Sequence, residues 1–339
     1  MVDTLLRNKQ YNEERRVQDE WEKRDFDRSK MLADVHREAK RRIQEKIDRY
    51  YLSYADENGL SLAEGRKRIR DFDVPSWAKK AAEAVQFKDF SPETNKWLKT
   101  YNRKMYISRL ELLKAEIDIE LQNLYSTDHH LIDKHLEAEY LAELKRQAGI
   151  LDVSSSGSSK RLRQVVDADF YGRGFSDNIW SRTGMYAIHK KKVFSALTRM
   201  HTDMTGYRNE MASLMKDFDV TEYEAMRLLR TESARMRATA QQDTLETNDF
   251  SHYRYVAERS ACAVCAILDG HVFKVEDAEI GINLFPMHPN CRCSRYGIHE
   301  LKRKDGTSNL DRYEVHENMD GYKQWFEREV EKEKARRRK

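Results

Sequence analysis

The chain has 339 residues, of which 35% are charged and 39% hydrophobic, and its mean hydropathy is −0.89. Only 13 glycines and 4 prolines interrupt this length, which favours long helices with much solvated surface over a compact enzyme fold. The net charge of +4 is a small difference between 62 basic and 58 acidic residues, so it identifies no nucleic-acid partner by itself. No apolar stretch approaches the ~20 residues that span a bilayer, so we expect a soluble protein with no membrane partner.

Amphipathic helices are predicted for the first part of the chain. Between Tyr11 and Tyr54, apolar residues recur at three- and four-residue steps, and Asn58-Gly59 can end this helix. A capping box at Ser61–Glu64 predicts a shorter helix, which Asp73-Val74-Pro75 interrupts.

A second pair of helices follows. Ser91-Pro92 combines an N-cap residue with proline at the first helical position, and the apolar stripe that follows predicts a helix to about Tyr125. We predict a separate helix from about Asp128 to Gln147, closed by Gly149.

A low-complexity stretch rich in serine marks the predicted domain boundary. We expect a mainly α protein, in which long N-terminal helices precede a small α+β C-terminal module resembling a zinc knuckle. Its four parts are an extended helical domain (1–150), a flexible linker (151–160), the mixed module with a Cys/His site (161–299) and a charged helical tail (300–339).

Within the C-terminal part, helical sequence is predicted through Trp180 to about His201. A capping box beginning at Thr221 predicts another helix to about Glu246. Strand-like sequence appears only afterwards, at Tyr253–Ala257 and around the hairpin turn signal Asp269-Gly270.

All four cysteines lie between residues 262 and 293, which indicates one local thiolate site in a reducing compartment and not a disulfide framework. Two thiols on a tight turn followed by a second cluster one loop away is a common arrangement around tetrahedral zinc. We expect four zinc ligands from five candidates: Cys262, Cys265, His288, Cys291 and Cys293.

The complete ligand set stays open at this point. Cys262 and Cys265 form the firmer pair; Cys291 with Cys293 completes an all-thiolate site, whereas His288 with either of them gives three thiolates and one imidazole. His271 follows the turn directly and is interpreted as a strand residue. Because every expected ligand comes from the protein, the Zn²⁺ site is predicted to be structural. The alternatives are four reduced thiols without metal, or a disulfide or redox pair.

Catalytic motifs are not evident. No nucleotide-binding glycine loop or H-E-x-x-H is present, and His36-Arg37-Glu38 lacks the proline-headed P-C-x-x-C of a zinc deaminase. Arg230 and Glu232 are expected in an ion pair, either at the surface or buried. Local basic runs are consistent with solvated faces or with phosphate binding. They are 160–163, 190–192, 302–304 and 334–339.

Several of these motifs together resemble the head-morphogenesis, or minor capsid, family of tailed phages, which is similar to the F protein of phage Mu. The resemblance covers about residues 165 to 295, and its specific part is the His-Pro-Asn-Cys-Arg-Cys run. Phe285-Pro286-Met287 departs from the Pro-Pro pair common in the family. The motifs are Arg230-Thr231-Glu232, Tyr253–Ala257, Cys262-x-x-Cys265, Leu268-Asp269-Gly270 and Pro286–Cys293.

The resemblance implies a non-catalytic minor head protein that acts in head assembly at the portal vertex and in handling or delivery of packaged DNA. Its implied partners are the portal protein, capsid or scaffold protein, and non-specific double-stranded DNA. Its implied location is the virion, inside the capsid near the portal, with the host cytoplasm during assembly. Two alternatives stay open: an effector enzyme such as an ADP-ribosyltransferase delivered with the DNA, and a zinc-dependent DNA-binding protein.

Overall fold

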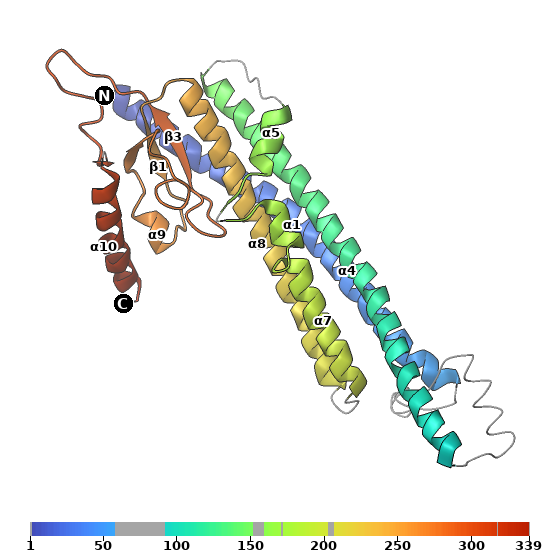
Figure 1. Cartoon of the computed structure of the whole chain (residues 1–339). Helices are drawn as coiled ribbons and strands as arrows, with labels where there is room; N and C mark the ends of the chain where they lie inside the picture. The colour runs from blue at the N-terminus through green and yellow to red at the C-terminus, as the bar shows by residue number, and fades with distance from the viewer. Residues whose placement is uncertain are drawn as a thin grey trace. The chain divides into compact units, whose positions relative to one another are not determined.

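The computed structural model describes residues 2–57, 92–151, 159–170, 172–202, 207–316 and 318–338 (Figure 1). The predicted capping box at Ser61–Glu64 and the break at Asp73-Val74-Pro75 lie outside the described residues, as does most of the predicted linker. The mainly α fold class with a small C-terminal sheet is confirmed. No helix among the described ranges is long and apolar enough to cross a membrane.

The chain forms two compact units. Unit 1 comprises Met1–Leu32, His130–Phe175 and Ala225–Lys339; unit 2 comprises Ala33–His129 and Ser176–Glu224. Three long helices contribute residues to both units: α1 (Val2–Glu57), α4 (Pro92–Leu151) and α8 (Tyr207–Thr247). The predicted four-part domain division stays a prediction.

Helix α4 corrects the prediction of two helices separated near residues 126–127, because it continues to Leu151. The Ser-Thr-Asp sequence at 126–128 is a cap signal only when these side chains bond to free N–H groups. Here Thr127 Oγ1 donates to the carbonyl of Asn123 one turn earlier, 2.8 Å away, and Asp128 accepts from His36 instead. The cap signal is therefore not used.

Helix α8 corrects a second boundary, since it begins at Tyr207 and passes through the predicted start at Thr221. Thr221 Oγ1 donates to the carbonyl of Phe218, 2.9 Å away, and caps no N–H group. Both errors have the same physical cause: a threonine hydroxyl bonds equally well to the preceding turn of a continuous helix.

The helix predicted through Trp180 to His201 is two helices, α6 (Phe175–Trp180) and α7 (Met185–Thr202). Gly184 lies in the turn between them, where an added Cβ would stand 2.7 Å from the carbonyl oxygen of Ile179. The close approach of two backbone segments requires glycine here. The short helix α5 (Ser159–Val166) precedes this pair.

Unit 1 contains a buried ionic cluster between its three long-helix segments. The guanidinium of Arg237 in α8 donates to Asp25 of α1 at 2.6 Å and to Glu139 of α4 at 2.7 Å, and it lies over the ring of Trp21. Arg237 is 2% exposed. Because an unpaired charge at this depth is costly, these contacts specify how the three segments pack within the unit.

Unit 2 contains a set of buried histidine and tyrosine side chains that are linked by hydrogen bonds and ring contacts. His36 Nε2 bonds to Asp128 at 2.8 Å, and the Tyr125 hydroxyl bonds to His189 Nδ1 at 3.0 Å. His189 packs edge-on against Phe218 of α8. His36 of the H-x-E sequence is thus a core histidine.

The sheet of unit 1 has the strand order β3-β1-β2-β4. Strand β1 (His252–Val256) pairs antiparallel with β2 (Val272–Lys274) and β3 (Ser294–Ile298), while β2 pairs parallel with β4 (Val315–His316). Helix α10 (Met319–Arg337) lies beside β2 and β4, where Tyr322 packs against Phe273 and His316.

Candidate metal centre

The first half of the candidate centre is a tight turn at the short helix α9 (Ala263–Ala266). Cys262 is the N-cap residue of α9, and its carbonyl accepts from the N–H of Ala266 at 2.9 Å. Cys265 lies within the helix and is buried. This local fold places both thiols on one side of the turn, as the Cys-x-x-Cys spacing predicts.

The second half is the loop from His288 to Cys293, which leads into β3. The N–H of Cys291 donates to the carbonyl of His288 at 3.1 Å, and Asn290 has a left-handed backbone with φ of 65°. The backbone N–H of Asn290 donates to Thr231 Oγ1 of α8 at 3.1 Å. Thr231 therefore fixes the loop at its strained position, a role that the sequence did not reveal.

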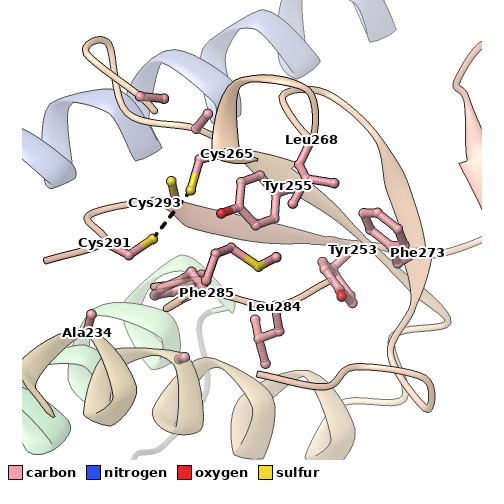
Figure 2. Packing of buried hydrophobic residues seen from close by; sticks show 14 of the residues in the cluster. Ala234, Tyr253, Tyr255, Cys265, Leu268, Phe273, Leu284, Phe285, Cys291 and Cys293 are labelled. Atoms are coloured by element: carbon pink, nitrogen blue, oxygen red, sulfur yellow. Dashed lines mark hydrogen bonds between the residues drawn. The ribbon is translucent and has the colours of Figure 1, made fainter. Parts of the chain in front are cut away.

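The five candidate ligands form two overlapping groups that share Cys265. His288 Nε2 lies 3.1 Å from the Cys262 sulfur and 3.2 Å from the Cys265 sulfur. The sulfurs of Cys265 and Cys291 are 3.8 Å apart, and Cys293 completes the second group within 4.8 Å (Figure 2). The structure thus brings all five predicted residues together.

The imidazole of His288 is oriented so that one ring nitrogen can bind a metal ion together with the cysteine sulfurs. Its Nδ1 contacts the carbonyl oxygen of Pro289 at 2.8 Å, so Nδ1 carries the proton and Nε2 faces the sulfurs. Zinc-binding histidines usually make such a bond with the nitrogen that does not bind metal.

Electrostatics in the cluster favour thiolates at two positions. Hydrogen bonds from Cys265 and His288 lower the pKa of Cys262 to about 4, and the same contact with Cys262 raises the pKa of His288 to about 9. A hydrogen bond from Cys265 also lowers the pKa of Cys291 well below its usual value. Burial raises the pKa of Cys293, whereas contact with the neighbouring Cys262 sulfur raises that of Cys265.

The cluster lies in the core of the module. Cys265, Cys291 and Cys293 are each 1% exposed, and none of the four cysteines is in a disulfide. The hydroxyl of Tyr255 in β1 points toward the sulfurs, among packed apolar side chains (Figure 2). Thiolates at this depth are costly unless a cation balances their charge, and a donor set of sulfurs and one imidazole fits a divalent ion such as zinc.

The N-terminal part of α1 anchors the same module. Gln18 donates to the carbonyl of Val256 at 2.9 Å, and Ser294, next to Cys293, donates to Glu14. Arg292 pairs with Glu22. These contacts connect residues on either side of the cysteine loop to one helix.

Several other residues singled out in the sequence have structural partners. Glu232 is buried and pairs with Arg235, whose guanidinium bonds to the carbonyls of Val165 and Val166. Among the basic runs, Lys190 pairs with Asp118 and Lys192 with Asp217. Most of the charge in that run is therefore compensated within the protein.

Comparison with known families identifies one match. Residues 191–296 match the family model described as phage Mu protein F like protein, and this segment contains all five candidate ligands. The match confirms the resemblance that the sequence motifs predicted. No curated protein and no solved structure matches the chain.

Proposed function

Because residues 191–296 match the phage Mu protein F like family, we propose that this chain is a phage head morphogenesis protein. Its role is that of a minor head component located in the virion. The single observation that carries this proposal is that the matched segment contains all five candidate metal ligands, together with helix α8, which bonds to their loop through Thr231.

The module is stabilised by one Zn²⁺ ion in this proposal. Two sulfurs bound at ~2.3 Å to tetrahedral zinc lie ~3.8 Å apart, and Cys265 and Cys291 have this separation. Cys262, Cys265, His288 and Cys291 are connected by short contacts, so we assign them as the four ligands. Cys293 is then a buried neighbouring thiol.

The ion has a structural role, because four protein ligands leave no position for a catalytic water. It would connect α9 to the loop before β3, two segments that the apolar core of a small module holds weakly on its own. We therefore propose a non-catalytic protein.

Within the head, we propose a position at the portal vertex and contact with the portal protein. Long helices with charged surfaces, such as α1 and α10, suit binding along other head proteins. The exposed basic residues Lys302, Arg303 and Lys304 suit weak contact with packaged DNA, which would be independent of base sequence and sensitive to salt.

Purified phage particles test the head role directly. Quantitative mass spectrometry of DNA-filled heads is expected to find the chain at a few copies per particle, and crosslinking is expected to join it to the portal protein. Absence of the chain from particles and from their assembly intermediates contradicts the proposal. Crosslinks to the major capsid protein without portal crosslinks would contradict only the assigned position.

A further inference from the structure

A second group of side chains that could hold a metal ion lies where β2 meets β4, and it shares no residue with the cysteine cluster. His271 directly precedes β2, Glu314 directly precedes β4, and His316 ends β4. A ligand atom from each of the three lies within 4.8 Å of the others.

The parallel register of these two strands creates the group. Val272 pairs with Val315 and Phe273 with His316, and the Val272 N–H donates to the carbonyl of Glu314 at 3.0 Å. Because side chains alternate along a strand, His271, Glu314 and His316 all face the same side of the sheet. Helix α10 places Trp325 on that side, with ring centroids 4.8 Å from His271 and 4.6 Å from His316.

We propose that His271, Glu314 and His316 bind a first-row divalent transition metal ion of the type that prefers imidazole and carboxylate ligands, such as Ni²⁺ or Cu²⁺. His271 Nδ1 and His316 Nε2 are 2.9 Å apart. Two nitrogens at ~2.1 Å from one ion, in adjacent positions at a right angle, lie ~3.0 Å apart, whereas tetrahedral positions lie ~3.4 Å apart. The observed separation is short enough for one ion to bind both nitrogens.

Access and chemistry distinguish this site from the cysteine cluster. The Glu314 side chain is 62% exposed, so an ion can enter from solvent; its carboxylate lies 3.8 Å from His271 Nε2, on the same ring as the nitrogen that faces His316. Three protein ligands leave positions for water, and without thiolates the site holds zinc less tightly than the cysteines do. This inference does not depend on the proposed head role.

The test uses the full chain with zinc already bound and Ni²⁺ as the probe. Isothermal titration should show one Ni²⁺ bound per chain, with quenching of tryptophan fluorescence that Trp325→Phe abolishes. Combining His271→Gln with His316→Gln should weaken Ni²⁺ binding by about 100-fold or more, because one ligand remains. His130→Gln, at an exposed histidine of α4, is the matched control.

Unchanged Ni²⁺ affinity in the double variant overturns the proposal and leaves only a hydrogen-bonded imidazole pair. Should the double variant misfold, Glu314→Gln at the exposed ligand provides the test: it should keep the fold and weaken binding by about tenfold, and an unchanged affinity again overturns the site. Cys262→Ser should leave the quenching at Trp325 intact, which separates this result from failure of the zinc proposal.

Discussion

The hydroxyl of Thr231 accepts a hydrogen bond from the backbone N–H of Asn290, 59 residues later in the chain. The same hydroxyl donates to the carbonyl of Arg227 within α8 at 2.7 Å. One side chain thus connects a regular helix to the loop that presents His288 and Cys291. The Arg-Thr-Glu motif and the His-Pro-Asn-Cys-Arg-Cys loop are therefore physically linked, because Thr231 of the motif bonds to Asn290 of the loop.

Thr231→Val should therefore loosen the loop without removing any metal ligand. The Asn290 N–H loses its partner, and we expect stability to fall by about 1–3 kcal/mol and zinc affinity by about tenfold. Thr239→Val is the matched control, since Thr239 bonds only to its own helix through the carbonyl of Arg235. Competition with a zinc chelator measures the affinity, and equal affinities for both variants would refute the role of Thr231.

The ligand assignment gives a sharper contrast between two cysteines. Cys262→Ser should release the zinc and lower the melting temperature of the module, because the remaining sulfurs are left in an apolar core. Cys293→Ser should retain one zinc ion per chain. Elemental analysis after dialysis measures the zinc content of both variants. If Cys293→Ser loses the zinc and Cys262→Ser keeps it, Cys293 replaces Cys262 in the ligand set.

Arg237→Met tests the buried ionic cluster. Removing this guanidinium leaves buried Asp25 with only His135 and Glu139 with only Arg24 as partners, and we expect a loss of about 3 kcal/mol in the free energy of unfolding. Arg41→Met is the control, because Arg41 is exposed and bonds to Glu38 and Glu45 of its own helix. Urea denaturation measures the free energy of unfolding of both variants. Similar losses would show that the buried cluster stabilises the fold no more than an exposed ion pair does.

Acid sensitivity is expected from His189 in unit 2. Burial lowers the pKa of His189 from 6.5 to about 3, and the nearby His36 makes a smaller contribution in the same direction. The unfolded chain therefore binds a proton between these pH values that the folded chain does not. The stability contribution is complete above pH 6.5 and is lost as the pH falls toward 3, at about 1.4 kcal/mol per pH unit.

The variant His189→Phe isolates this effect. Its free energy of unfolding should fall less steeply than that of the wild type between about pH 7 and pH 5. The difference between the two proteins at each pH cancels contributions from the other titrating groups. A wild-type slope in His189→Phe would disprove the assignment.

Two glycines should respond to alanine in opposite directions. In Gly184→Ala the new Cβ meets the Ile179 carbonyl, and we expect a loss of about 1–3 kcal/mol. Gly149→Ala, in α4, meets nothing within 4 Å and should gain about 0.5–1 kcal/mol from helix propensity. Thermal unfolding measures the change in stability of both variants. An unchanged stability in Gly184→Ala would mean that the turn adjusts to the added Cβ without cost.

Features encoded in short stretches of sequence could be predicted, and features that depend on distant pairs could not. The cysteine cluster follows from Cys-x-x-Cys and the loop at His288, both of which act over a few residues. The capping box at Thr221 misled because a threonine hydroxyl can bond either to a free N–H group or to a carbonyl of the preceding turn. The pairing of Arg237 with Asp25 spans 212 positions and has no local signature.

The interpretation of His271 shows the same limit. As a residue beside the hairpin turn it was assigned to a strand, and it directly precedes β2. Its contact with His316 arises only because β2 and β4 pair in parallel, 45 residues apart. The sequence has no pattern that indicates this pairing, since β4 is too short to have a periodicity.

The contacts between the start of α1 and the sheet have a consequence for biosynthesis. Tyr11 bonds to Asp269 and Glu14 to Ser294, across separations of 258 and 280 residues. A ribosome makes the helix long before its partner strands exist, so these two contacts form only after most of the chain has been translated. Unit 1 therefore completes its packing late in synthesis, because its first helix must wait for strands encoded near the other end of the chain.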